Sequence, residues 1–260
     1  MAFMQCQFHS DVLGRACSMN VIIPQKAKTQ IGMASSGSGR KDYPVIYLLH
    51  GLSDDHTIWM RRTSIERYAA DYEAVIVMPN GDRGFYTDMK CGPKYWTMLS
   101  EELPAIVQSL FPVSSRREDT FAAGLSMGGY GALKLALRCP NRFAGAVALS
   151  AVADIREWFS VASAFSKDNE YHWIFGSAEE IVAQRNDLFE LAKTAITHNP
   201  PPKIMMACGT SDPLYRSNLR LRDHLSQLNF PGFRFDEGPG KHEWAFWDQW
   251  IQEGLRFLLM

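Results

Sequence analysis

The apolar positions divide the chain into short strand-like runs that alternate with longer helix-like segments. Short apolar runs, which predict buried strands, lie at 45–49, 74–78, 120–123, 145–149 and 203–208. Two earlier runs, 3–9 and 17–23, alternate more and predict an antiparallel edge, and a last strand is expected at 233–236. Helices are predicted at 61–72, 95–110, 127–138, 214–228 and 243–259. The alternation predicts an α/β fold with a mostly parallel central sheet and helices on both faces.

Two segments depart from this alternation. The glycine- and serine-rich stretch 31–41 is expected to form a flexible surface loop. The stretch 151–202 has little strand character and many aromatic residues, and a structureless loop of that length is uncommon in a compact domain. We expect short helices that form a small cap insertion over the carboxyl edge of the sheet; a helical hairpin on the side of the fold is the alternative. Because no internal repeat or interdomain linker is evident, residues 1–260 are expected to form a single domain.

A glycine-flanked serine stands where the predicted strand 120–123 meets the predicted helix 127–138. The sequence there is GLSMGG, with Ser126 between Gly124 and Gly128. A G-x-S-x-G motif between a strand and a helix is typical of the nucleophile elbow, a turn so tight that only glycine fits on either side of the serine. Ser126 is therefore the predicted nucleophile. The alternative is a glycine-rich turn that only packs a helix on the sheet.

A serine hydroxyl needs a neighbouring base, and an α/β-hydrolase supplies an acid and then a histidine later in the chain. His242 lies in a turn-rich loop between the last predicted strand and the last predicted helix, from which it can reach Ser126. Asp212 follows the predicted strand 203–208 and can accept the Nδ1 proton of His242. The alternative for Asp212 is a plain helix N-cap, because Asp-Pro often begins a helix.

Acyl transfer also requires hydrogen-bond donors for the developing oxyanion. The backbone N–H of Met127, directly after the predicted nucleophile, is one expected donor. The loop after the strand 45–49 is expected to supply the other, and the N–H of Leu52 is the candidate because Gly51 lets the backbone turn. His50 is predicted to hold the shape of this loop rather than to act as a second base.

Aromatic residues near these segments are candidates for the substrate-binding wall. We predict that Trp59, Tyr86 and Trp244 line an acyl or alcohol pocket, together with aromatic residues of the cap stretch. The alternative for each is a position in the core, where most large aromatic side chains are buried.

Composition narrows the classes of partner. The chain is 46% hydrophobic and 21% charged with a formal net charge of −1, which argues against nucleic acid or an anionic membrane surface as a partner. No apolar run approaches the ~18–20 residues that span a bilayer, and no signal peptide is evident. The five cysteines are scattered and lack C-x-x-C spacing, so they favour reduced thiols in a cytoplasmic protein over a disulfide framework or a metal site.

A series of motifs then occurs in one order: HGL at 50–52, VIVMP at 75–79, YTD at 86–88, EELP at 101–104, GLSMGGYGA at 124–132, GTSD at 209–212 and HEW at 242–244. With these motifs the chain resembles the esterase D group of α/β-hydrolases, which includes S-formylglutathione hydrolases, bacterial tributyrin (acetyl) esterases, feruloyl and acetylxylan esterases, and mycolyltransferases. It looks closest to the tributyrin esterases, small intracellular carboxylesterases that prefer short acyl chains.

The resemblance extends from about Phe3 to the C-terminus. It places the triad of the family on Ser126, Asp212 and His242, and its oxyanion donors on the backbone of Leu52 and Met127. It also implies a homo-oligomer, either a dimer or a tetramer.

One position departs from the pattern of the S-formylglutathione hydrolases. Their oxyanion loop resembles HGLTCT or SGLTCT, whereas this chain has HGLSDD, with Asp54 in place of the cysteine. We therefore predict a serine carboxylesterase that hydrolyses short-chain (acetyl to butyryl) esters of small molecules through an acyl-enzyme, with no metal or organic cofactor. The alternatives are a thioesterase acting on S-formylglutathione, an acetyl or feruloyl esterase acting on glycan fragments, and a non-catalytic binding module.

Overall fold

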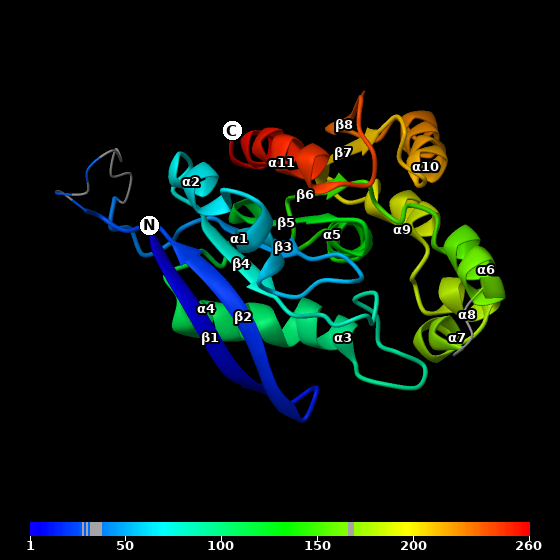
Figure 1. The fold of residues 1–260 in the computed structure, drawn as a ribbon, viewed down its shortest axis with the longest axis horizontal. Coiled ribbons are helices and arrows are strands. Elements are labelled where there is room, and N and C mark those ends of the chain that lie inside the picture. The colour runs from blue at the N-terminus through cyan, green and yellow to red at the C-terminus, as the bar shows by residue number, and fades with distance from the viewer. Residues whose placement is uncertain (28, 30, 32–37, 166–168) are drawn as a thin grey trace.

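The computed structural model describes residues 1–27, 29, 31, 38–165 and 169–260 (Figure 1). Within these residues, eight strands form one sheet in the order β1-β2-β4-β3-β5-β6-β7-β8. Strands β3 to β8 are parallel, whereas β1 pairs antiparallel with β2, and β2 antiparallel with β4. Every predicted strand is present, including the antiparallel edge. The bounds are β1 Ala2–Ser10, β2 Arg15–Ile23, β3 Val45–Leu49, β4 Val75–Pro79, β5 Thr120–Leu125, β6 Gly145–Leu149, β7 Lys203–Gly209 and β8 Phe233–Gly238.

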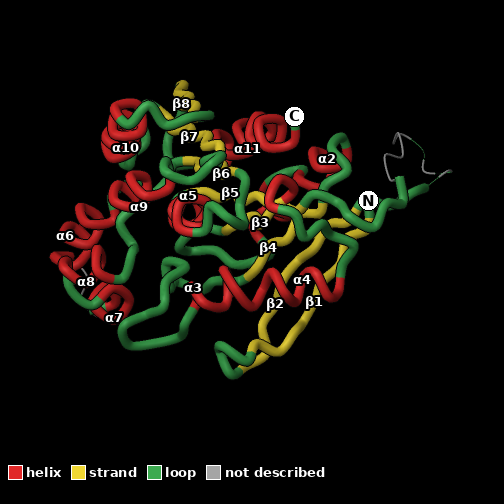
Figure 2. The backbone as a smooth tube through the Cα atoms, turned by 180° about the vertical axis from the view of Figure 1, so that it is seen from behind, coloured by secondary structure: helices red, strands yellow, loops and turns green. Residues whose placement is uncertain are grey.

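Helices cover both faces of this sheet, as Figures 1 and 2 show from opposite sides. One apolar core lies between the sheet and α1, α2 and α11, and the other between the sheet and the helices from α3 to α10. Successive side chains of β3 point alternately into the two cores, because side chains alternate between the faces of a strand. Ile46 lies in the first core and Tyr47 in the second. The bounds are α1 Ile58–Arg62, α2 Ile65–Ala70, α3 Tyr95–Thr97, α4 Leu103–Leu110, α5 Met127–Arg138, α6 Ile155–Phe165, α7 Glu170–Phe175, α8 Ala178–Ala183, α9 Leu188–Ala195, α10 Tyr215–Gln227 and α11 Trp244–Leu259.

The helix predicted at 61–72 is wrong as one element, because the chain forms two short helices, α1 and α2, with Thr63 between them. The backbone of Thr63 is extended. Its hydroxyl donates to the carbonyl of Trp59 at 2.6 Å and accepts from the N–H of Ile65 at 3.2 Å. A threonine side chain that satisfies backbone groups in this way competes with the helical ladder and ends it.

The helix predicted at 95–110 is present but irregular. A π-helical turn, Met98–Glu102, joins α3 to α4. Pro104 stands in the first turn of α4 and has no N–H to donate to the preceding turn. A widened turn ahead of the proline accommodates this missing hydrogen bond. None of the helices in the described ranges combines the length and apolar character of a membrane-spanning segment.

The stretch 151–202 is helical, as predicted, and contains α6, α7, α8 and α9. Helices α6, α7 and α8 pack on one another at one end of the molecule, whereas α9 packs on α5 beside the sheet (Figure 1). The insertion is therefore a small helical group made mainly of α6 to α8. Most of the loop predicted at 31–41, namely 32–37, lies outside the described residues.

Candidate active site

Ser126 occupies a sharp turn between β5 and α5. Its backbone has φ 53° and ψ −119°, a combination that non-glycine residues rarely adopt. The turn is held because the Ser126 N–H donates to the carbonyl of Leu149 at 2.8 Å, and the Ser126 carbonyl accepts from the N–H of Tyr130 at 3.0 Å. Such a strained serine, fixed by its neighbours, is typical of a functional position.

The two elbow glycines are required by close backbone packing. A Cβ on Gly124 would lie 2.4 Å from the carbonyl oxygen of Gly128. A Cβ on Gly128 would lie 2.4 Å from the carbonyl oxygen of Leu49 and 2.6 Å from that of His50. The turn that carries Ser126 therefore packs directly against the strand end from which the predicted oxyanion loop begins.

Ser126, His242 and Asp212 form a continuous hydrogen-bonded chain. The Oγ atom of Ser126 lies 3.0 Å from Nε2 of His242, and Nδ1 of His242 lies 2.9 Å from Oδ2 of Asp212. With Asp212 ionised, His242 donates its Nδ1–H to the carboxylate and leaves Nε2 free to accept the serine proton. The structure thus brings together the three residues that the sequence singled out, 116 and 30 positions apart along the chain.

Asp212 is held in its charged form. Its side chain is fully buried, and burial alone would raise its pKa. Hydrogen bonds and attraction from His242, together with hydrogen bonds from the Leu214 N–H and from Ser150, outweigh burial and lower the pKa. The contact with the Leu214 N–H, 2.8 Å long, means that Asp212 also caps the turn leading to α10. Both interpretations of Asp212 from the sequence therefore describe real contacts.

The loops that carry the acid and the base are tied to each other. The N–H of Ser211 donates to the carbonyl of Gly240 at 3.0 Å, and the N–H of Thr210 donates to that of Gly238 at 2.9 Å. A Cβ on Gly209 would lie 2.5 Å from the carbonyl oxygen of Gly240, so this close approach also needs a glycine. The distance from Asp212 to His242 is thus set by backbone contacts.

His50 holds the predicted oxyanion loop, as expected. Its Nδ1 lies 2.8 Å from the carbonyl oxygen of Gly51, and its Nε2 accepts from the N–H of Gly81 at 2.9 Å. Burial lowers the pKa of His50, partly offset by its bond to the Gly51 carbonyl and by nearby carboxylates, so the neutral ring fits this pair of bonds. The loop that includes Leu52 is thereby fixed beside Ser126.

A cavity of about 560 Å³ opens at this point. Its wall includes Ser126, His242 and the loop 51–54, and three indole rings contribute to it: Trp158, Trp244 and Trp247. The size is within the range of about 300–1,000 Å³ that is usual for small-molecule sites. Trp158 comes from α6, so the helical insertion does reach the site, which favours the cap interpretation of this segment.

Two of the three predicted wall residues do not line this cavity. Trp59 is buried beneath it, where its Nε1–H donates to the carbonyl of Leu49 at 3.0 Å and its ring packs against that of Trp244. Tyr86 is also buried, and its hydroxyl donates to the carbonyl of His50 at 2.9 Å. Both aromatic residues therefore support the backbone of the oxyanion strand instead of contacting substrate, and only Trp244 lines the cavity.

Trp158 is one of the cap aromatic residues that the sequence predicted for the wall, whereas the wall residues Asp54, Arg83 and Trp247 were not predicted to contribute to substrate binding. Trp247 could have been predicted from the sequence, because it lies near the start of the helix that follows the predicted base His242 and is therefore close to it. Trp158 and Arg83 reach the cavity only through the tertiary placement of α6 and of the loop after β4.

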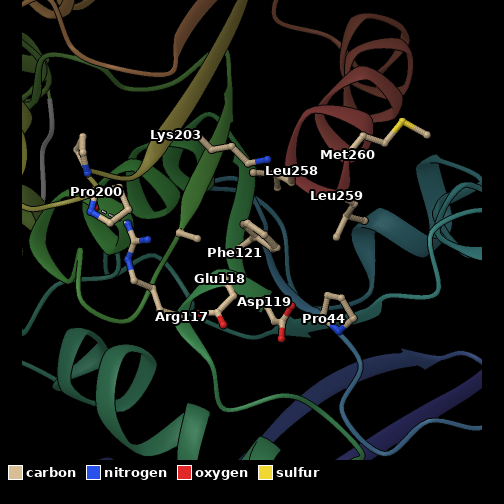
Figure 3. Close-up of a pocket in the computed structure, with 12 residues that line it drawn as sticks. Pro44, Arg117, Glu118, Asp119, Phe121, Pro200, Lys203, Leu258, Leu259 and Met260 are labelled. Atoms are coloured by element: carbon tan, nitrogen blue, oxygen red, sulfur yellow. Dashed lines mark hydrogen bonds between the residues drawn. The ribbon is translucent and has the colours of Figure 1, made fainter.

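A second cavity, of about 410 Å³, lies at the opposite end of the strands. Its wall includes Phe121 at the start of β5 and Lys203 at the start of β7, next to the C-terminal residues of α11 (Figure 3). Ser126 and Asp212 follow the carboxyl ends of the same two strands. This second cavity is therefore remote from the triad and includes none of the predicted site residues.

Comparison with known proteins agrees with this geometry. The sequence profile of the family described as "Putative esterase" matches residues 10–258. The chain belongs to this esterase family. It is 29% identical to an acetyl esterase of Caldicellulosiruptor saccharolyticus over 99% of this chain and 98% of that protein.

Two solved structures from Staphylococcus aureus are more similar still. Fluorophosphonate-binding serine hydrolase F (FphF), solved with substrate bound, is 34% identical with a TM-score of 0.87, over 100% of this chain and 98% of that one. An S-formylglutathione hydrolase (FrmB) is 34% identical with a TM-score of 0.85, over 100% and 99%. The esterase therefore has the α/β-hydrolase fold and is a serine ester hydrolase that acts on small-molecule esters.

Proposed function

We propose that Ser126, His242 and Asp212 are the catalytic triad of a carboxylesterase that hydrolyses short-chain acyl esters. The 3.0 Å contact between Ser126 Oγ and His242 Nε2 carries this proposal. His242 takes the serine proton as Oγ attacks the ester carbonyl, and then gives it to the departing alcohol as the C–O bond breaks. Water attacks the acyl-enzyme with His242 again as the base, which releases the carboxylic acid and regenerates Ser126.

The tetrahedral oxyanion would be stabilised by the backbone N–H groups of Met127 and Leu52. Met127 is the first residue of α5, so its N–H has no partner within the helix and lies at the positive end of the helix dipole. Leu52 lies in the loop fixed by His50 and lines the cavity beside Ser126. Donors that are already in place before the reaction stabilise the charge without reorganisation.

The preference for acetyl to butyryl chains is supported by the walls around Ser126. The three indoles limit the room, and the charged side chains of Asp54, Arg83 and Glu243 stand in the same wall. A long alkyl chain would have to pass these charged groups and would remove water from them. The acetyl esterase relative is consistent with a small acyl group.

A thioesterase acting on S-formylglutathione is the second candidate, favoured by the 34% identity to the S. aureus enzyme of that name. The two candidates differ in their best substrate. A panel of p-nitrophenyl esters from acetyl to dodecanoyl, together with S-formylglutathione, should show the highest kcat/KM at two to four carbons. Dominant turnover of S-formylglutathione would instead establish the thioesterase.

The role of Ser126 is tested separately. A fluorophosphonate probe should add its mass to the peptide that contains Ser126, and Ser126→Ala should remove both the label and nearly all hydrolysis while the protein stays folded. Substantial hydrolysis by Ser126→Ala would refute the triad.

We also propose a single domain over residues 1–260, a cytoplasmic location and a homo-oligomer, either a dimer or a tetramer. One sheet draws its strands from the whole span from Ala2 to Gly238, which supports the single domain. The five cysteines are free thiols, as is usual in a reducing compartment. Light scattering of the purified protein tests the oligomer.

A further inference from the structure

Asp54 is a carboxylate in the cavity of the proposed nucleophile that the proposed hydrolytic mechanism does not use. It lines the same cavity as Ser126 and is half-buried. A methyl group placed on Gly51 would lie 3.1 Å from Asp54 Oδ2 and 3.8 Å from Ser126 Cβ. The Cδ1 atom of Leu125 would lie 2.8 Å from the same methyl group, so the side chains of Asp54, Leu125 and Ser126 pack closely around Gly51.

The charge of Asp54 has no partner at ion-pair distance. Among the described residues, no Lys, Arg or His forms an ion pair with it. Burial raises the pKa of Asp54, and attraction from His50, a hydrogen bond from the backbone of Gly51 and weaker attraction from Arg62 only partly offset it. The one arginine of the cavity wall, Arg83, is already neutralised, because its guanidinium binds both carboxylate oxygens of Glu170 at 2.6 and 2.8 Å. The cavity thus presents an uncompensated negative charge.

A second carboxylate adds to this field. Glu243 lines the cavity and, in the described chain, accepts a hydrogen bond only from the backbone N–H of Lys241, at 3.0 Å. The loop of His242 and Glu243 adjoins the segment that follows Asp54, because Trp244 packs on Trp59 with ring centroids 5.3 Å apart. The proposed acid for the leaving group, His242, therefore shares its cavity with two carboxylates, Asp54 and Glu243.

We propose that Asp54 is a specificity-determining residue that makes this esterase select esters of uncharged or cationic alcohols and discriminate against anionic leaving groups. This inference rests on the proposed triad and names the substrate class of that site. Like charges a few ångströms apart in a partly desolvated wall repel, so an anionic leaving group is disfavoured in the Michaelis complex and in the transition state. Glutathione, which carries a net negative charge at neutral pH, belongs to the disfavoured class.

The experiment uses three acetate esters of phenols that differ at the para position: trimethylammonio, tert-butyl and sulfonate. These groups have similar shape and carry positive, zero and negative charge. Each kcat/KM is divided by the rate of hydroxide-catalysed hydrolysis of the same ester, which corrects for the leaving group's own reactivity. For the wild type, the corrected kcat/KM of the sulfonate ester should be on the order of tenfold below that of the tert-butyl ester.

The isosteric variant Asp54→Asn should bring this ratio close to one, and added salt should reduce it in the wild type by screening. Asp55→Asn is the matched control on the same loop, because the Asp55 carboxylate binds the N–H and hydroxyl of Thr57 and does not line the cavity. Asp55→Asn should leave most of the ratio in place. Because only ratios are compared, a general loss of activity in either variant cancels.

A wild-type ratio near one, or a ratio that Asp54→Asn does not change, overturns the inference. So does an equal change in Asp55→Asn, since the loop as a whole would then be responsible. These outcomes are distinct from failure of the triad, which would appear as hydrolysis of all three esters by Ser126→Ala.

Discussion

The indole ring of Trp247 lies edge-on to the imidazole ring of His242, with ring centroids 4.8 Å apart and planes at 86°. The same indole donates its Nε1–H to the hydroxyl of Ser150 at 3.0 Å, and Ser150 in turn hydrogen-bonds Asp212. One buried side chain at the start of α11 therefore contacts the proposed base directly and the proposed acid through a single hydroxyl.

Ser150→Ala should lower kcat about two- to tenfold and leave KM nearly unchanged, since one hydrogen bond of about 0.5–1.5 kcal/mol to the Asp212 carboxylate is lost. Steady-state kinetics with p-nitrophenyl acetate measure this effect. The thermal unfolding midpoint serves as the control for a purely structural change. A rise in KM with an unchanged kcat would contradict the positioning role of Ser150.

Asp212→Asn separates the two contacts of this side chain. Asparagine keeps an acceptor for the Leu214 N–H, so the turn into α10 should persist, but it lacks the charge that stabilises the imidazolium of His242. By analogy with serine proteases, kcat should fall about 10³- to 10⁴-fold at neutral pH. A fall of less than tenfold in a folded variant would mean that Asp212 serves only as a cap.

Trp158→Leu should extend the range of accepted acyl chains. Trp158 lines the cavity from α6 and packs against Phe85 and Tyr171 with ring centroids 6.3 and 6.2 Å apart. A smaller side chain opens the wall while keeping apolar packing, so the ratio of octanoyl to acetyl kcat/KM on p-nitrophenyl esters should rise severalfold. An unchanged chain-length profile would place the acyl group on another wall.

The buried side chain of Lys134 should make the stability of the protein depend on pH. Its side chain is fully buried and forms no ion pair with a carboxylate in the part of the chain that the structure describes; Nζ donates to the carbonyl of Tyr86 at 3.1 Å and to the Thr87 hydroxyl at 2.8 Å. Burial, with repulsion from Arg138, lowers the pKa of Lys134 well below 10.5. The unfolded chain then binds more protons than the folded one between the two pKa values, so stability rises with pH in that window.

Lys134→Met removes this dependence. Between pH 7.5 and 9.5 the free energy of unfolding of the wild type should increase by about 1–3 kcal/mol relative to the variant. Urea unfolding of both proteins at the two pH values gives the difference. The unsatisfied Tyr86 carbonyl of the variant lowers its free energy of unfolding equally at both pH values, so it does not affect the difference. The tyrosines titrate in both proteins and therefore contribute equally to both pH profiles. Parallel pH profiles would show that Lys134 is not neutral in the folded protein.

The part of the site that follows from local sequence could be predicted. The elbow around Ser126 is a local motif, and His242 and Asp212 each follow a strand whose carboxyl end the sheet brings to the same edge. The strands and their antiparallel edge were also predicted, because each strand is a local apolar run, whereas their order in the sheet was not predicted.

The walls of the site could not be predicted in the same way. Tyr86 lies in the core, and its backbone has φ 48°. Non-glycine residues rarely adopt this conformation, so the sequence gives no indication of it. Trp59 is buried through tertiary contacts, because its indole bonds the carbonyl of Leu49 and packs on Trp244 of α11. Trp158 lines the cavity of Ser126 because of where α6 packs in the fold. The hydrophobic periodicity of a helix shows which of its faces is buried but not which part of the protein that face contacts.

The close contact between Gly128 and the carbonyl oxygens of Leu49 and His50 joins the nucleophile turn to the oxyanion strand as one rigid block. Any side chain at that glycine would displace the turn of the proposed nucleophile and the strand before the proposed oxyanion loop together. New substrates must therefore be acquired elsewhere. For laboratory evolution of this enzyme, the productive positions are Trp158 and Trp244, whose side chains line the cavity from α6 and α11.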